Sequence, residues 1–311
     1  MQDIATLTVN PTIDKNTRVE RVRAGEKLRC EPPRREPGGG GLNVSRAIHR
    51  LGGRSSAHYL SGGATGTILE SLLDEEGVEH ELIPIEGWTR ENLIVYEDSS
   101  GDQFRFGMPG PEVSEAEWRE ALSHLGRLDP SPAYLVASGS LSPGAPDDFY
   151  AKVARVAQEL GARLVVDTSG APLREAVEEG AFLIKPNIAE FQELVGEDLP
   201  DEQAQREAGR EMISRGSVHA IALSLGRGGA LLITKEGSEP IRTPTVPIRS
   251  KVGAGDSMVA GTVLALARGK ELRDAVRFGV AAGAAAVMTE GTELCRREDT
   301  ERLYKGMEAN R

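Results

Sequence analysis

Short apolar segments of strand length alternate with helix-length segments through most of this chain. The expected strands are Ile4–Val9, His58–Ser61, Tyr134–Ser138, Arg163–Asp167, Phe182–Lys185, Ala220–Ser224 and Ala230–Thr234. Strands that are apolar throughout and separated by helices are typical of parallel sheets, because both faces of such sheets are buried. The alternation therefore predicts an α/β fold in which helices cover both faces of a mainly parallel sheet.

Two segments interrupt this alternation. Polar and apolar residues alternate from Arg18 to Arg35, which predicts exposed strands with one solvated face. A β-hairpin is expected where Asn92–Glu97 and Gln103–Phe106 flank the turn at residues 99–102. Paired together, the two segments form a small sheet that stands off the main body. Its apolar face either closes over a ligand as a lid or packs on the same sheet of a second subunit.

The charge balance excludes some classes of partner. The 311 residues include 37 Lys and Arg against 48 Asp and Glu, for a net charge of −11. A protein that binds nucleic acid needs a basic face, so we expect no nucleic-acid partner for this acidic chain. The start of the chain lacks a signal-peptide pattern, and its longest apolar run, residues 279–288, is too short to span a bilayer. We therefore expect a cytoplasmic protein without a membrane partner.

Cysteines and histidines suggest no chemistry in the sequence. The two cysteines, Cys30 and Cys295, imply no disulfide framework and fit a reducing cytosol. The five histidines, at positions 49, 58, 80, 124 and 219, show no metal-ligand spacing. They are accordingly assigned no role.

The most informative motif is Lys251–Ser257, in which two glycines, an acid and a hydroxyl precede the apolar run Met258–Ala267. Glycines before a helix predict a tight turn, after which unpaired backbone N–H groups and the helix dipole favour an anionic oxygen. Asp256 would stand beside this anion site, where it can take a proton from a hydroxyl that attacks phosphorus. The alternative is that Asp256 is only a helix N-cap.

Four consecutive glycines, Gly38–Gly41, lead into a second helix at residues 44–51. No Gly-Lys-Ser/Thr follows, so this is no Walker A loop, and the position in the chain disfavours a nicotinamide site. A glycine floor under a flat-lying sugar is one interpretation, and a flexible loop is the other. Asp14 follows the first strand, at the edge where α/β sheets bind ligands, although an Asx turn also explains it.

Three further patterns point to phosphate, magnesium and nucleotide. The cations Lys27, Arg29, Arg90 and Arg105 lie in or beside the small sheet and predict a phosphate clamp, or else solvated edge-strand charges. Asn187 and Glu190, three residues apart, can hold a hydrated Mg²⁺ or form an N-cap with an acidic first turn. The glycine turn at 224–230 can lie under a nucleotide, but a hairpin explains it equally well.

Together these stretches resemble the ribokinase-like (PfkB) family of carbohydrate kinases over essentially the whole chain. Gly38–Asn43 and Val252–Ser257 correspond to the two signatures of that family, and Asn187 with Glu190 to its Asn-x-x-Glu motif. The resemblance implies a three-layer α/β/α sandwich with a small β lid, in one domain spanning 1–311. The lid is expected at about 14–36 and 88–108.

Within the family, the chain is most similar to bacterial members that phosphorylate fructose 6-phosphate. The similarity lies in Glu26–Cys30, Glu36–Gly41, Trp88–Arg90 and Met108–Gly110. Relatives that use fructose 1-phosphate typically carry Lys at the position of Gly40. The resemblance thus implies ATP-dependent phosphorylation at O1 of fructose 6-phosphate, a step of glycolysis. A kinase for tagatose 6-phosphate or fructose 1-phosphate, or a non-catalytic sugar-phosphate sensor, is the alternative, although retention of Asp256 argues against a sensor.

The resemblance also implies a role for each matching position. Asp256 would be the base, and the amides of Gly253, Ala254 and Gly255 the anion hole. The sugar phosphate would contact Asp14, Lys27, Arg29, Gly39, Gly40, Asn43, Arg90, Arg105 and Ser138. The ATP would contact Lys185, Asn187, Ser224, Gly226, Gly229 and Lys251. Asn187 and Glu190 would organise Mg²⁺, partly through water, and a K⁺ site would be bounded by Ser250, Val252, Ala286 and Gly291. A homodimer through the lid is expected.

Two positions depart from the family pattern. The family usually has Thr where this chain has Lys251, so a cation there would contact ATP phosphate or disturb the neighbouring ion site. Ala189 stands where the relatives that use fructose 6-phosphate often carry Lys, which leaves nucleotide regulation open.

Overall fold

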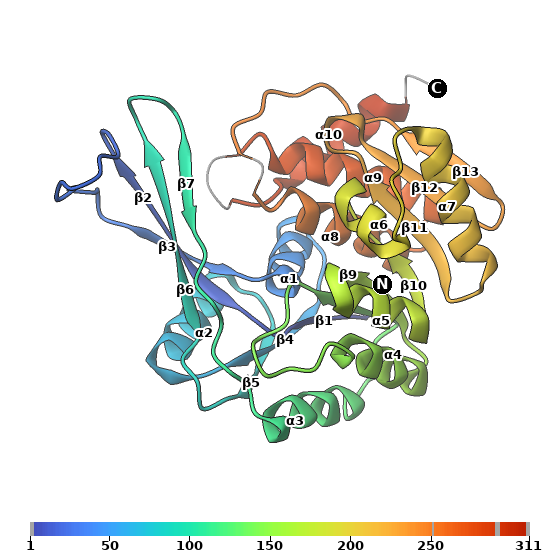
Figure 1. The fold of residues 1–311 in the computed structure, drawn as a ribbon, viewed down its shortest axis with the longest axis horizontal. Coiled ribbons are helices and arrows are strands. Elements are labelled where there is room, and N and C mark those ends of the chain that lie inside the picture. Colours follow the sequence, from blue (N-terminus) through green and yellow to red (C-terminus); the bar gives the residue numbers. More distant parts are fainter. Residues whose placement is uncertain (1–2, 251, 290–292, 309–311) are drawn as a thin grey trace.

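The computed structural model of the chain describes residues 3–250, 252–289 and 293–308. Its main body is built on a nine-stranded sheet of order β13-β12-β11-β10-β9-β8-β1-β4-β5, and a smaller sheet stands to one side (Figure 1). The strands of the large sheet are β1 (Ile4–Thr8), β4 (Ser56–Ser61), β5 (His80–Pro84), β8 (Tyr134–Ser138), β9 (Arg163–Asp167), β10 (Ala181–Ile184), β11 (Val218–Ser224), β12 (Ala230–Thr234) and β13 (Gly237–Ile241). All neighbouring strands from β5 to β11 are parallel, while β12 and β13 are antiparallel additions.

Helices cover both faces of this sheet, because consecutive strand residues enter two different cores. Ile4, Tyr134 and Val136 belong to one core, while Ala5 and Leu135 belong to the other. The first core is closed by α1 (Gly40–Arg50), α8 (Ala254–Ala267), α9 (Leu272–Ala286) and α10 (Arg297–Glu308). The second is closed by α3 (Glu115–Gly126), α4 (Phe149–Leu160), α5 (Gly170–Glu179), α6 (Ile188–Val195) and α7 (Glu202–Ser214). The three-layer α/β/α fold expected from the resemblance is confirmed.

The strand order reverses at β1. The chain runs from β1 outward to β4 and β5, and then returns to place β8 on the other side of β1. Such a switch point leaves a crevice beyond the carboxyl ends of the two strands, where open α/β sheets bind their ligands. The glycines at the start of α1 lie at this point, as the contacts of the site show below.

The small sheet has the order β3-β2-β6-β7 and is confirmed as an excursion from the alternating pattern. Its strands are β2 (Thr12–Val19), β3 (Arg34–Gly38), β6 (Arg90–Glu97) and β7 (Gln103–Phe106). The expected hairpin is correct, since β6 and β7 pair antiparallel. Its partner strand was placed too late in the chain, because β6 pairs with β2 at residues 12–19 rather than with residues 18–35. Most of residues 20–33 is exposed and irregular.

The early start of β2 has a physical reason. Ile13 is fully buried against Leu69 and Leu73 of α2 (Gly63–Glu76), so the lid strand begins inside a small core of its own. Asn10-Pro11 interrupts the strands only briefly between β1 and β2. Asp14 therefore lies within the lid strand, and the prediction that it directly follows the first strand was wrong.

Close packing of α8 on α9 is also confirmed. A Cβ added at Gly261 would lie 2.9 Å from the Cβ of Ala282, and one at Gly279 would lie 2.5 Å from the carbonyl oxygen of Met258. Larger residues would push the two helices apart, so these glycines set the position of the helix that carries Asp256. None of the helices in the described part of the chain is long and apolar enough to cross a membrane.

Candidate active site

Asp256 lies in the first turn of α8, and its carboxylate does not cap the helix. The N-cap is Gly253, whose φ of 73° places it in the left-handed region, and no side chain caps this helix terminus. The amides of Ala254, Gly255 and Asp256 belong to the first turn, where backbone N–H groups lack intrahelical acceptors. The alternative interpretation of Asp256 as an N-cap is wrong. Its carboxylate stands beside first-turn amides that have no intrahelical acceptors.

Asn43 of α1 holds Asp256 from the other side. Its Nδ2 donates to Asp256 Oδ2 over 2.9 Å. Burial and the nearby carboxylate of Asp167 raise the pKa of Asp256 to about 6, although Asn43 and Lys185 act in the opposite direction. A carboxylate whose pKa is raised to this range is ionised at neutral pH and is a stronger base than an ordinary Asp.

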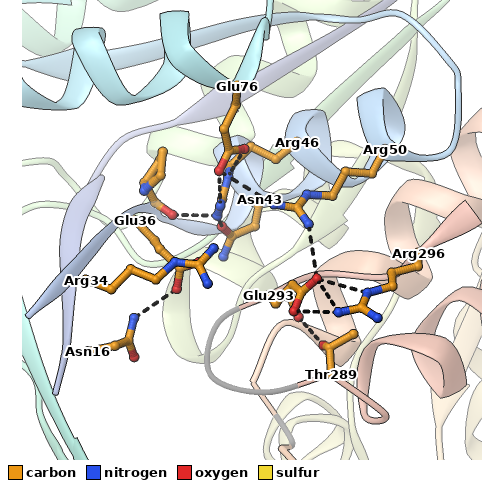
Figure 2. Close-up of polar contacts among 11 residues, drawn as sticks. Asn16, Arg34, Glu36, Asn43, Arg46, Arg50, Glu76, Thr289, Glu293 and Arg296 are labelled. Atoms are coloured by element: carbon orange, nitrogen blue, oxygen red, sulfur yellow. Dashed lines mark hydrogen bonds and ion pairs between the residues drawn. The ribbon is translucent and has the colours of Figure 1, made fainter. Parts of the chain in front are cut away.

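Arg46 fixes the orientation of the Asn43 amide. The Arg46 side chain has no exposed surface, and its Nη1 donates to Asn43 Oδ1 over 3.0 Å and to the carbonyl oxygen of Pro37 over 2.6 Å. Its Nε and Nη2 make a bidentate pair with the carboxylate of Glu76, at 2.7 and 2.6 Å (Figure 2). With its oxygen held by Arg46, the amide of Asn43 must present its nitrogen to Asp256. No pattern in the sequence had indicated Arg46 or Glu76.

The glycines before α1 form a floor that has no room for side chains. A Cβ at Gly41 would lie 2.3 Å from the carbonyl oxygen of Leu7 in β1, and one at Gly40 would lie 2.3 Å from Ser138 Oγ at the end of β8. A Cβ at Gly38 would lie 2.6 Å from Asp14 Oδ2. Gly39, between them, has a φ of 113° that favours glycine. The floor thus fills the switch point between β1 and β8 and brings Asp14 and Ser138 beside it.

Asp14 and its neighbours occupy the lid face toward this floor. Asp14 Oδ1 accepts a hydrogen bond from Asn92 Nδ2 over 3.0 Å, and burial raises the pKa of Asp14 although Arg46, Arg105 and Arg90 oppose it. Arg105 is an exposed residue of β7 whose register partner, Ile94, lies on the same lid face as Asn92. The predicted residues Asp14 and Arg105 therefore share this face.

Arg90 connects the lid to the main body. Its guanidinium donates to the carbonyl oxygens of Asn10 at 2.9 Å, Met108 at 3.1 Å and Pro11 at 3.4 Å. Three of its five N–H groups are used in this way, which leaves one on each terminal nitrogen for an anion. Lys27 and Arg29 lie on the exposed segment between β2 and β3, and no described contact places them near Asp14. Of the four predicted cations, Arg90 and Arg105 therefore lie near Asp14, whereas no described contact brings Lys27 or Arg29 there.

Lys185 lies beside the first turn of α8. It follows β10, and a Cβ at Gly255 would be 3.5 Å from its Nζ. Its Nζ lies 3.0 Å from Asp167 Oδ1. Although burial acts to lower the pKa of Lys185, Asp167 raises it above the ordinary value, with Glu190 and Asp256 contributing. The chain therefore keeps a buried cation against the first turn of α8. The sequence had not indicated a role for Asp167. The signal that could have found it is its position as an acid at the carboxyl end of the strand β9.

Asn187 and Glu190 form a capping box at the start of α6. Asn187 Oδ1 accepts from the Glu190 amide at 2.9 Å, and Glu190 Oε2 accepts from the Asn187 amide at 2.8 Å. The N-cap interpretation is confirmed, but the second carboxylate oxygen of Glu190 lies outside the box. Asn187 also bridges to Ser224, whose amide donates to the Pro186 carbonyl oxygen at 2.8 Å. Asn187 and Ser224 therefore lie side by side at the carboxyl edge.

The glycine turn after Ser224 is a hairpin, as one interpretation expected. Gly226 begins a short 3₁₀ turn, Gly226–Gly228, and Gly229 has a φ of 92°. A Cβ at Gly229 would lie 2.0 Å from the carbonyl oxygen of Ile241 in β13, so the turn lies flat against that strand.

The described residues assigned to a potassium ion lie near the end of α9. Ser250 is buried, its Oγ accepts from the Val252 amide at 3.2 Å, and its own amide lies 3.3 Å from the Val287 carbonyl oxygen. The carbonyl of Ala286 accepts from Thr289 Oγ1 at 2.7 Å. These oxygen donors suit a hard monovalent cation. Lys251 and Gly291 lie outside the described residues.

The sequence profile of the pfkB family carbohydrate kinases matches residues 7–299. The chain belongs to the pfkB family of carbohydrate kinases. It is 44% identical over 302 residues to the ATP-dependent 6-phosphofructokinase isozyme 2 of Mycobacterium tuberculosis, covering 97% of this chain and 89% of that one. It is 42% identical over 305 residues to the Escherichia coli protein of the same name, covering 98% of both chains. The 1-phosphofructokinase of Bacillus subtilis is 33% identical over 292 residues, with 93% and 95% covered.

Solved structures of this kinase family agree with the fold. Phosphofructokinase-2 from Escherichia coli in complex with potassium has a TM-score of 0.95 and 41% identity, covering 99% of this chain and all of that one. The complex of the same enzyme with fructose 6-phosphate has a TM-score of 0.93 and 40% identity at the same coverage. A tetrameric inhibited form of that enzyme has a TM-score of 0.94 and 40% identity, again at that coverage.

Proposed function

We propose that this pfkB-family kinase transfers the γ-phosphoryl group of ATP to O1 of D-fructose 6-phosphate, giving fructose 1,6-bisphosphate and ADP. The observation that carries the proposal is the arrangement around Asp256. A carboxylate with a raised pKa stands in the first turn of α8, accepts a hydrogen bond from the Asn43 amide and has the Lys185 ammonium nearby. The relatives from Mycobacterium tuberculosis and Escherichia coli, at 44% and 42% identity, are named for this activity.

Asp256 acts as the general base. The C1 hydroxyl of the sugar gives its proton to the Asp256 carboxylate while its oxygen forms a bond to the γ-phosphorus. The bond from phosphorus to the bridging oxygen breaks, and ADP leaves. The amides of Gly253, Ala254 and Gly255 stabilise the charge on the transferring group, because donors fixed in advance need no reorganisation. Lys185, beside Gly255, adds a positive charge at the same place.

Sugar and nucleotide occupy opposite sides of this anion hole. Asp14, Asn43 and Ser138, with Gly39 and Gly40 beneath, surround the space for the sugar hydroxyls. Arg90 binds the 6-phosphate with its two remaining N–H groups, and Lys27, Arg29 and Arg105 supply further positive charge from the lid. The nucleotide lies over Ser224, Gly226 and Gly229, with Lys251, Lys185 and Asn187 near its phosphates.

Two cations complete the site. Asn187 and Glu190 would hold Mg²⁺ largely through water, since the oxygen outside their capping box fits a hard ion that keeps most of its hydration shell. When bound, Mg²⁺ neutralises charge on the β- and γ-phosphates. Oxygen donors at Ser250, Val252, Ala286 and Gly291 would hold K⁺, and the Escherichia coli relative is known in complex with potassium.

The alternatives are kinases for tagatose 6-phosphate or fructose 1-phosphate and a non-catalytic sugar-phosphate sensor. A side chain at Gly40 would meet Ser138 Oγ at 2.3 Å, so the floor here has no room for a lysine of the kind carried by relatives that use fructose 1-phosphate. A sensor has no need for a base with a raised pKa. Fructose 1-phosphate is the second candidate substrate, because the Bacillus subtilis relative is named 1-phosphofructokinase.

The working form is proposed to be a cytoplasmic homodimer that takes part in glycolysis and pairs through the lid. The lid face turned away from Asp14 carries Leu93 and Phe106, whose exposed fractions are 36% and 47%. Burial of this face by a second copy removes apolar surface from water.

A coupled assay of ADP release tests the proposal. It compares fructose 6-phosphate, tagatose 6-phosphate and fructose 1-phosphate at equal concentrations, with Asp256→Asn as the background. Rapid ADP release that requires fructose 6-phosphate supports the assignment. If another sugar phosphate gives the highest kcat/KM, the substrate is wrong, and if none exceeds the background, the protein is a sensor.

A further inference from the structure

A second group of chemically active side chains lies at the opposite end of the large sheet from Asp256. His58 is the third residue of β4, Glu81 is the second residue of β5, and His124 lies in α3. His58 and Glu81 are direct neighbours in the parallel pairing of β4 with β5. Both lie toward the amino ends of their strands, whereas the kinase site lies beyond the carboxyl ends.

Three ligand atoms of this group converge on one point. His58 Nδ1 lies 2.9 Å from His124 Nε2, and Glu81 Oε2 lies 3.8 and 3.7 Å from these two nitrogens. A position equidistant from the three atoms is about 2.0 Å from each, which follows from those three separations. Bonds from Zn²⁺ to imidazole nitrogen and carboxylate oxygen are about 2.0–2.2 Å long. The three atoms already surround a space of the right radius.

The surroundings of His58 leave the correct nitrogen available. Ser56 Oγ lies 3.0 Å from His58 Nε2. When that nitrogen is the hydrogen-bond donor to the hydroxyl, Nδ1 carries the lone pair and is available as a ligand. An outer partner that fixes the ring tautomer is typical of histidines that bind metals.

The group is also reachable from water. The exposed fraction of the side chain is 62% for Glu81 and 14% for His124, while His58 is buried at 3%. A water molecule can therefore supply a fourth ligand from the side of Glu81. The two rings are tilted by 55° rather than stacked.

We propose that His58, Glu81 and His124 form a binding site for a divalent transition-metal ion of the Zn²⁺ class. Two imidazoles and one carboxylate select zinc, cobalt, nickel or copper over magnesium, which prefers oxygen ligands alone. The ion joins the edge strand β5 and the helix α3 to β4, so it stabilises this end of the fold. The site is separate from the kinase centre and does not depend on the proposed reaction.

The test is metal binding by the full chain after treatment with a chelator, followed by calorimetric titration with Zn²⁺ in excess Mg²⁺. The Mg²⁺ saturates oxygen-donor sites such as Glu190. One equivalent is expected to bind, to raise the Tm and, as Co²⁺, to give the strong visible absorption of a four-coordinate ion. Because replacement of even an outer-shell partner costs roughly 10–100-fold in affinity, His124→Gln and Glu81→Gln should each weaken binding by at least ~10-fold.

The matched control is His219→Gln, which replaces an exposed histidine on β11 and should bind Zn²⁺ as the wild type does. His124 and Glu81 are the preferred positions because both are more exposed than His58, so the variants should fold. Binding that persists in His124→Gln, or no uptake at one equivalent, overturns the proposal and leaves a hydrogen-bonded histidine pair. The measurement uses no kinase activity, so its failure is distinct from failure of the proposed function.

Discussion

Asn43 Nδ2 donates to Asp256 Oδ2 over 2.9 Å, although 213 residues separate the two in the chain. The bond joins the helix after the glycine floor to the helix after the anion hole. It therefore connects the side of the site proposed for the sugar to the carboxylate proposed as base. Its consequences can be measured through both turnover and pH dependence.

Replacement of the base should abolish most turnover. Asp256→Asn keeps the size of the side chain but cannot accept the proton of the sugar hydroxyl. We expect kcat to fall by at least ~10²-fold, which is the lower end of what a positioned base contributes, with little change in KM. Near-normal turnover, in a variant whose circular dichroism matches the wild type, would show that Asp256 is not the base.

The pH dependence of kcat/KM should report the protonation of Asp256. Since burial and Asp167 raise the pKa of Asp256 to about 6, kcat/KM should fall as the pH drops through this value and the base becomes protonated. Removal of the stabilising hydrogen bond in Asn43→Ala should move the acid limb to higher pH. Removal of the neighbouring negative charge in Asp167→Asn should move it to lower pH. Shifts of equal sign in the two variants would contradict this electrostatic account.

Glu76 is expected to act through two other residues. It holds Arg46 by a bidentate contact, and Arg46 holds the Asn43 oxygen (Figure 2). In Glu76→Gln the Asn43 amide is free to turn, so kcat should fall and the acid limb should move to higher pH. Glu75→Gln, which changes an exposed neighbour on the same helix, is the matched control. A loss of Tm in Glu76→Gln without a shift in the pH profile would mean that Glu76 only stabilises the fold.

The strand and helix pattern was largely predictable from sequence, because each element buries its own apolar residues. Tyr134–Ser138 and Arg163–Asp167 were predicted at the bounds that the structure has. The lid was harder. Its first strand was placed about six residues late, since Asn10-Pro11 resembles a strand terminator and the burial of Ile13 by α2 is a tertiary effect.

The site was predictable only where local pattern carries it. Glycines before a helix are a local signal of an anion site, so the sequence alone could place Asp256 and Gly253 at the start of α8. Arg46 and Glu76 meet through the packing of α1 on α2, and no spacing in the sequence shows such a pair. The same holds for His58 and His124, which lie 66 residues apart. Contacts between elements far apart in the chain depend on the assembled fold.

The dimer through the lid is a separate prediction. Light scattering at assay concentration should give twice the mass of the chain. Phe106→Asp should shift the protein toward the monomer, because a charge on the outer lid face opposes burial by a second copy. Ile248→Asp, at an exposed apolar residue outside the lid, is the control. A wild-type monomer with full activity would contradict this assembly.

The choice of sugar phosphate tests the central claim most directly. The measurement is kcat/KM for fructose 6-phosphate and fructose 1-phosphate in the wild type and in Arg90→Ala. Arg90 and Arg105 both act on the pKa of Asp14, so their charges lie near the part of the site proposed for the sugar. The wild type should prefer the 6-phosphate. The variant should show a KM for it raised by roughly 10-fold, as expected for a lost charge-assisted hydrogen bond of about 1.5–3 kcal/mol, and an almost unchanged KM for ATP. Preference for the 1-phosphate, or a defect confined to ATP, would contradict the account.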